Sequence, residues 1–120
     1  MFLFLSAAFG FLSVALGAFA AHALKARFDE YSLNVFRTGV DYQFYHSLAL
    51  GLVALIILVR PHRLLNASAW AFVAGMVIFS GSLYLLAFTK VKMWGAVTPI
   101  DGLSFLIGWV LLAAAALKVR

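Results

Sequence analysis

The sequence has no cysteine and few charged residues, and each absence narrows the class of protein. Without cysteine, the chain has no disulfide, thiolate metal site, c-type haem attachment or thiol nucleophile. Only 11% of the 120 residues are charged and 66% are hydrophobic, which leaves too little polar surface to cover a water-soluble globule. The sequence therefore predicts an integral membrane protein.

The net charge of +5 at first suggests nucleic-acid binding, but the positions of the basic residues argue against it. These residues lie between the apolar runs or at the C-terminus, where cations meet lipid phosphates. They are Lys25, Arg27, Arg37, Arg60, Arg63, Lys90, Lys92, Lys118 and Arg120. We interpret them as membrane anchors, so the expected partners include membrane lipids and exclude nucleic acid.

Four apolar runs predict an all-α fold with one transmembrane domain over residues 1–120. The expected transmembrane helices cover about 2–24, 42–59, 68–88 and 99–117. Apolar residues at three- and four-residue spacings predict an amphipathic interfacial helix at about 29–41, which is expected to run into the second transmembrane helix. For the fourth helix, Thr98 is expected to cap the first turn, Pro99 to occupy its first position and Asp101 to act as a capping carboxylate.

The expected location is the inner (plasma) membrane, with both termini in the cytoplasm. With cytoplasmic termini, that side holds Arg60, Arg63, Lys118 and Arg120, none of them beside a carboxylate. Five basic residues fall on the other side, three of them within an acidic amphipathic segment. The two counts nearly tie, and we favour cytoplasmic termini because the basic residues on that side lie close to the helix ends and away from carboxylates.

Small residues recur on one face of the first helix. Spacings of three and four residues align Ser6, Gly10, Ser13, Gly17 and Ala21. In lipid such a stripe lets two helix backbones approach closely. We expect it to pack within the molecule, with a homo-oligomer as the alternative.

Polar residues gather in one leaflet when the four helices are threaded antiparallel. The set comprises His22, Tyr42, Gln43, His46, Ser80, Ser82, Tyr84 and Thr98, with Asp101 close by. Polar groups in hydrocarbon are costly unless partnered, so we interpret this set, the candidate cleft, as a possible ligand-binding site. The alternative, which is somewhat favoured, is that its members bond to one another and hold the helices in register.

The two histidines of this set raise the question of haem or metal. Antiparallel threading is expected to bring His22 and His46 to the same depth, within reach of one iron. Two histidines without a ligand-spaced motif are weak evidence, so no cofactor is predicted. His62 falls in a loop and is expected to be solvated, and Asp101 is better explained by capping than by acid catalysis.

Four short motifs resemble domain-of-unknown-function family 423, the transmembrane protein 256-like membrane proteins. The motifs are residues 17–22 (GAFAAH), 38–43 (TGVDYQ) with His46, 79–84 (FSGSLY) and 98–100 (TPI). The sequence departs from the family pattern at Ala20, Phe36 and Asp101, where relatives usually carry glycine, an aromatic residue such as tryptophan, and glycine. The resemblance implies a small four-helix membrane protein of unassigned activity.

These observations predict a non-enzymatic membrane protein that binds a lipid, a small ligand or a partner subunit in the candidate cleft. A small transporter or proton-coupled protein is the alternative, in which His22 or His46 would titrate near neutral pH. A haem- or metal-binding subunit is a second alternative. The sequence contains no recognisable internal repeat that would support the transporter hypothesis.

Overall fold

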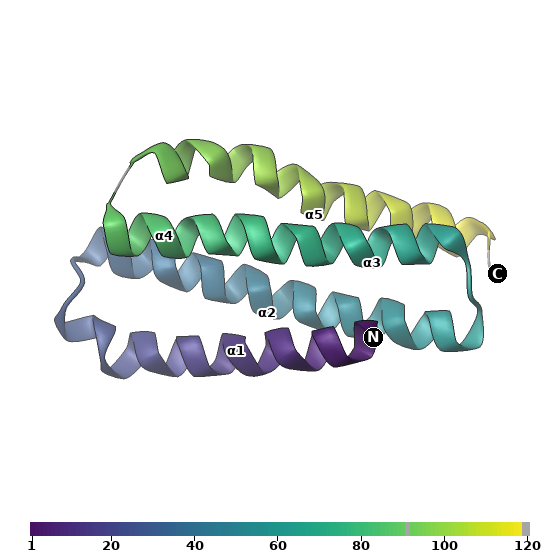
Figure 1. Cartoon of the computed structure of the whole chain (residues 1–120), viewed down its shortest axis with the longest axis horizontal. Helices are drawn as coiled ribbons and strands as arrows, with labels where there is room; N and C mark the ends of the chain where they lie inside the picture. Colours follow the sequence, from purple (N-terminus) through teal and green to yellow (C-terminus); the bar gives the residue numbers. More distant parts are fainter. Residues whose placement is uncertain (91, 119–120) are drawn as a thin grey trace.

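The computed structural model describes the backbone of residues 1–90 and 92–118 and the side chains of residues 1–90 and 102–118. This part of the chain is helical, with no strand, and its helices run up and down along one long axis (Figure 1). Three helices are long and apolar enough to cross a membrane, Phe2–Ala26, Glu30–Val59 and Arg63–Thr89, and Gly102–Lys118 is a shorter apolar helix. The predicted all-α membrane fold with four helices is confirmed.

Apart from α1, which ends at His22, the helices are longer than the apolar runs that predicted them. Their bounds are α1 Phe2–His22, followed by a 3-10 turn η1 Leu24–Ala26, then α2 Glu30–Val59, α3 Arg63–Gly75, η2 Met76–Ser80, α4 Gly81–Thr89 and α5 Lys92–Lys118. The segment η2 is π-helical and joins α3 and α4 into one continuous rod.

Residues 29–41 lead directly into the second transmembrane helix, as the sequence predicts, and α2 runs unbroken from Glu30 to Val59. The start of α2 is fixed by Asp29, whose carboxylate accepts a hydrogen bond from the Ser32 backbone N–H at 3.0 Å. Hydrogen bonding by Ser32, through its side chain and its backbone, lowers the pKa of Asp29. At 1.5 Å per residue, α2 is about 45 Å long, which exceeds the roughly 30 Å hydrocarbon layer.

Two other helices begin earlier than predicted. His62 caps α3, since its ring Nδ1 accepts a hydrogen bond from the Leu64 N–H at 3.1 Å, and it is not simply a solvated loop residue. Lys90 adopts a left-handed conformation with a φ of 59°, which turns the chain sharply after α4. Because α5 then begins at Lys92, Thr98 is inside the helix and not at its N-cap. The side chains of Thr98 and Asp101 lie outside the described residues.

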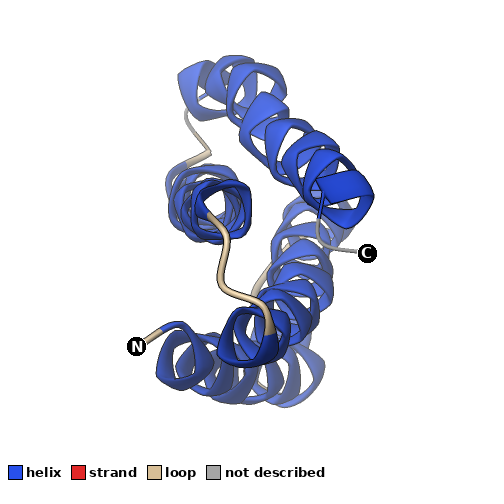
Figure 2. Cartoon of the chain, turned by 90° about the vertical axis from the view of Figure 1, so that its right-hand side faces the viewer, coloured by secondary structure: helices blue, strands red, loops and turns tan. Residues whose placement is uncertain are grey.

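The helices form an open arrangement in which α1 and α5 lie at opposite edges (Figures 1 and 2). Helix α1 packs mainly on α2, and both α2 and α5 pack on the α3–η2–α4 rod. The larger core cluster lies between α2, the rod and α5: Ala49, Leu50, Val53, Leu65, Ala69, Phe72, Met76, Phe79, Leu83, Phe105 and Ala115. A smaller cluster joins α1, η1, α2 and α4: Ala20, Leu24, Phe36, Val40 and Ala87.

The small residues of α1 pack within the molecule, as predicted, with Ser6, Gly10 and Gly17 against α2, although Ala21 is exposed. Pairs that approach closely across the two helices are Gly10 with Ser47, Gly17 with Val40, and Ser6 with Gly51. In each pair the two residue numbers sum to 57, which defines the register of α1 along α2. The Ser6 hydroxyl also donates to the Ser47 carbonyl at 2.7 Å.

Helix α5 is joined to the rod by two phenylalanine rings that each rest on a glycine of the opposite helix. A Cβ atom at Gly75 would lie 2.4 Å from the Phe105 ring, and one at Gly108 would lie 2.6 Å from the Phe72 ring. Neither glycine has a positive φ, so both are required by space and not by backbone conformation.

Alanine substitutions should therefore separate these two glycines from Gly81, where an added Cβ would meet nothing within 4 Å. We expect Gly75→Ala and Gly108→Ala each to destabilise the protein by about 1–3 kcal/mol through overpacking. Gly81→Ala should change stability by less than about 1 kcal/mol, toward stabilisation, because alanine favours a helix. Thermal denaturation in detergent micelles, followed by circular dichroism, measures this, and equal effects at the three glycines would contradict the packing.

Candidate functional site

The Gln43 side chain connects three helices inside the candidate cleft. It projects from α2 and is 4% exposed. Its amide Nε2 donates to the Phe9 carbonyl of α1 at 2.9 Å, and its Oε1 accepts from the Tyr84 hydroxyl of α4 at 2.6 Å. A glutamine amide offers both donors and an acceptor, so one side chain can bind both neighbouring helices.

A close approach between α2 and the rod lets Tyr84 reach Gln43. A Cβ at Gly39 would lie 2.7 Å from a Tyr84 ring carbon, so the ring lies directly on the α2 backbone. The Gly39 carbonyl also accepts a hydrogen bond from the Ser80 hydroxyl at 2.9 Å. Ser80 is the last residue of the π-helical η2, a geometry that is rare and usually local. Nothing in the sequence pattern predicted this segment.

His46 uses both ring nitrogens within the chain. Its Nδ1 lies 2.8 Å from the Tyr42 carbonyl and its Nε2 lies 3.1 Å from the indole Nε1 of Trp109. A carbonyl accepts and an indole N–H donates, so the contacts assign a neutral ring with the proton on Nδ1. The imidazole also stacks on Phe105, with ring centroids 3.7 Å apart and planes 12° apart.

Aromatic rings from four segments surround His46. The rings of Tyr42 and Phe79 lie 4.9 Å apart between centroids, those of Phe79 and Phe105 5.3 Å, and those of Phe72 and Trp109 5.1 Å. We call these five residues and His46 the aromatic cluster. Tyr42 and Trp109 are 40% and 44% exposed, so they form its outer edge.

The sequence alone does not reveal the contributions of α3 and α5 to this cluster. Phenylalanine occurs 12 times in the chain, so Phe72 and Phe105 do not stand out. The available signal was the pair Gly75 and Gly108, because a glycine inside an apolar helix often marks a close approach. The indole of Trp109, four residues after Phe105, was a second signal.

The remaining candidates have different surroundings. The Ser82 hydroxyl donates to the Ile78 carbonyl of its own rod at 2.6 Å. His22 lies on the exposed end of α1, away from the buried His46. The structure thus brings together Tyr42, Gln43, His46, Ser80 and Tyr84, with Ser82 beside them. Ligand binding at these residues stays a prediction.

The expectation that His22 and His46 share one depth is wrong. In the α1–α2 register, His22 lies opposite residue 35, which is 11 residues before His46. At 1.5 Å per residue, this separates the two histidines by about 16 Å along the helix axis. The error follows from starting the second helix at residue 42, when α2 already begins at Glu30.

Hydrogen bonding accounts for every buried polar side chain in this part of the molecule. Among the described side chains, each buried nitrogen and oxygen has a partner. Three interhelical contacts, from Gln43, Ser80 and Trp109, supply partners inside the apolar layer. The arrangement therefore fixes helix positions, which in lipid depends on close packing and on such contacts.

These features define a small multi-pass membrane protein whose helices are held by interhelical hydrogen bonds and aromatic packing. A family model described as a protein of unknown function, DUF423, matches residues 16–102. The chain belongs to this family.

Relatives at about 40% identity extend the match over nearly the whole chain. UPF0382 membrane protein YwdK of Bacillus subtilis is 40% identical over 119 residues, covering 98% of this chain and 97% of the relative. UPF0382 membrane protein SAB0533 of Staphylococcus aureus is 38% identical over 118 residues, covering 98% and 96%. UPF0382 inner membrane protein YgdD of Escherichia coli K12 is 39% identical over 111 residues, covering 92% and 85%. No solved structure matches the chain.

Removing the tyrosine hydroxyl tests the contribution of the Gln43 contact. We expect Tyr84→Phe to lower the free energy of unfolding by about 0.6–1.7 kcal/mol, which spans the average and the maximum for hydrogen bonds between membrane helices. Tyr45→Phe is the matched control, since Tyr45 lies on α2 and is 56% exposed. Denaturation in detergent micelles measures both, and equal stabilities would show that the Tyr84 hydroxyl adds nothing.

The hydrogen bonds also predict opposite tautomers for two histidines. His46 should carry its proton on Nδ1, whereas His62 should carry it on Nε2, because His62 Nδ1 accepts from Leu64. Ring ¹⁵N chemical shifts at about pH 8.5, well above the usual histidine pKa, distinguish the two forms. Trp109→Phe should shift His46 Nε2 and leave His62 unchanged. Matching tautomers in the unsubstituted protein would contradict the assignment.

Proposed function

We propose that this chain is a non-catalytic inner-membrane protein that binds a partner membrane protein on the outward face of α2. The inner-membrane location is supported by the name of the Escherichia coli relative. In this proposal the buried polar residues hold α2 in place, and the exposed polar residues of the same helix contact the partner.

The observation that carries the proposal is the contrast between the inner and outer polar groups of α2. The inner ones, Gln43 and His46, are buried and bonded within the chain. The outer ones are exposed and follow one another at spacings of one, three and four residues. We call them the outer stripe: Asn34, Arg37, Thr38, Asp41 and Tyr45.

The depth of the outer stripe makes it costly to leave in lipid. By the α1–α2 register, Arg37 lies opposite Ala20 and Asp41 lies opposite Leu16. Residues 2–24 carry no Asp, Glu, Lys or Arg, so the stripe lies beside a helix without charged side chains. Charged groups at such a level are stabilised by pairing. A partner helix with acidic and basic side chains at the same depth would provide that pairing.

Other functions expected from the sequence have less support. Coordination of one iron by both His22 and His46 conflicts with their separation of about 16 Å along the helices. Proton transfer through His46 would first have to break its contacts with Tyr42 and Trp109. A ligand in the candidate cleft would likewise compete with the bond between Gln43 and Tyr84.

Cytoplasmic termini form part of the proposal. The end of the molecule that holds the start of α1 and the end of α5 also holds Arg60, Arg63 and Lys118. The four acidic residues of the sequence are Asp29, Glu30, Asp41 and Asp101. Each of them lies before α2 or in the first half of α2 or α5, so none belongs to the end of the molecule that holds Arg60 and Lys118. Basic residues close to helix ends favour the cytoplasmic side.

Site-specific photocrosslinking in intact membranes tests the partner. A benzophenone amino acid at positions 38 and 45 should yield an adduct with one defined polypeptide. Positions 11 and 106 are the matched controls, because Phe11 and Leu106 are 73% and 61% exposed on α1 and α5. The double substitution Arg37→Ala and Asp41→Ala should abolish the adduct at position 45. Adducts with lipid alone, or with a second copy of this chain, would overturn the proposal.

A further inference from the structure

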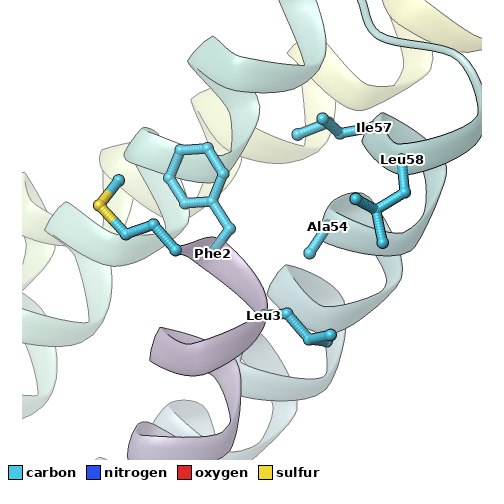
Figure 3. Close-up of a pocket in the computed structure, with 6 residues that line it drawn as sticks. Phe2, Leu3, Ala54, Ile57 and Leu58 are labelled. Carbon is cyan, nitrogen blue, oxygen red and sulfur yellow. The ribbon is translucent and has the colours of Figure 1, made fainter.

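An apolar pocket lies at the end of the molecule opposite the candidate cleft. It has a volume of about 280 Å³ and is lined by Met1, Phe2, Leu3, Ala54, Ile57 and Leu58 (Figure 3). The pocket exists because α1 begins at Phe2, which the register places opposite residue 55, whereas α2 continues to Val59. The last turn of α2 therefore extends beyond α1.

One rim of the pocket is braced by an aromatic contact. The Phe2 and Trp70 rings meet edge to face with centroids 5.1 Å apart, which ties the start of α1 to α3. Trp70 is 51% exposed, as is common for tryptophan at a membrane interface. The opening is bordered on the α2 side by Leu58, which is 73% exposed.

Basic residues follow the pocket-lining part of α2 in the chain. Arg60 follows α2 and Arg63 begins α3, and both are exposed. Lys118 ends α5 at the same end of the molecule. The first acidic residue met along α2 from this end is Asp41, at least 13 residues before Ala54. Basic side chains at a membrane surface attract anionic lipid headgroups by about 1 kcal/mol each.

We propose that this pocket binds part of an acyl chain of an anionic phospholipid, with its phosphate against Arg63 and Arg60. The lining offers no polar side chain, so it suits hydrocarbon. The volume is at or below the low end of the roughly 300–1,000 Å³ typical of drug-sized ligand sites, which suits a segment of one chain. Two copies of the protein in the same orientation would bring like-charged ends together, so a second copy is a poorer occupant.

Native mass spectrometry of the full chain in detergent, with phosphatidylglycerol or phosphatidylcholine as the added lipid, tests the proposal. We expect phosphatidylglycerol to be retained in preference to phosphatidylcholine. Arg63→Gln should weaken that retention about fivefold, the factor for one surface cation, and Arg60→Gln with Arg63→Gln should weaken it further. Lys25→Gln, at the other end of the molecule, is the matched control and should have no effect.

Adjacent residues of α2 test the pocket itself. Leu58 lines it and Val59 does not, although both are exposed at the same depth. Leu58→Gln should reduce retention of phosphatidylglycerol, and Val59→Gln should leave it unchanged. Both side chains are largely exposed, so neither substitution disturbs the core. Equal retention of the two lipids, an equal loss in Lys25→Gln, or equal losses in the two α2 variants would overturn the proposal. None of these results depends on the partner of the outer stripe.

Discussion

The interhelical hydrogen bonds of α2 are the constraint on which the rest of the structure depends. Between helices in lipid there is no hydrophobic driving force, so association requires close packing and polar contacts. Gln43 supplies polar contacts to two helices from one position, since its side chain bonds to the Phe9 carbonyl of α1 and to the Tyr84 hydroxyl of α4. An unpartnered amide at this depth would be costly, and therefore the three helices meet in one arrangement.

The aromatic cluster depends in turn on where α5 lies. Gly75 and Gly108 admit the rings of Phe105 and Phe72. Two hydroxyl contacts follow the same interface: Ser68 donates to the Gly108 carbonyl at 2.7 Å, and Ser104 donates to the Ala71 carbonyl at 3.0 Å. With Phe105 fixed in this way, its ring forms the surface on which His46 stacks. A substitution at either glycine would therefore displace the ring that His46 stacks on, although neither glycine contacts His46.

The sequence was sufficient to predict the four helices and to select the polar residues, but it did not predict the depth of those residues relative to one another. Long uncharged runs predict membrane-spanning helices because hydrocarbon admits little else. The caps at Asp29 and His62 lie outside the apolar runs, so hydropathy alone places the helix starts too late. Continuing α2 back to Glu30 moved His22 away from His46. The π-helical turn that ends at Ser80 and the positions of Phe72 and Phe105 arise from tertiary contacts. The spacing of apolar residues in the local sequence does not predict such contacts.

The pocket at the other end follows from the same hydrogen bonds. Sliding α1 by one turn toward Val59 would cover Ile57 and Leu58 with apolar side chains. In the observed register, lipid has to cover them instead. That movement would also take Phe9 away from Gln43 and Ser6 away from the Ser47 carbonyl. Covering a pocket with protein instead of lipid gains little where both are apolar, whereas breaking two hydrogen bonds in hydrocarbon is costly. The register is therefore decided at the polar end, and the pocket persists at the other because closing it would break those bonds.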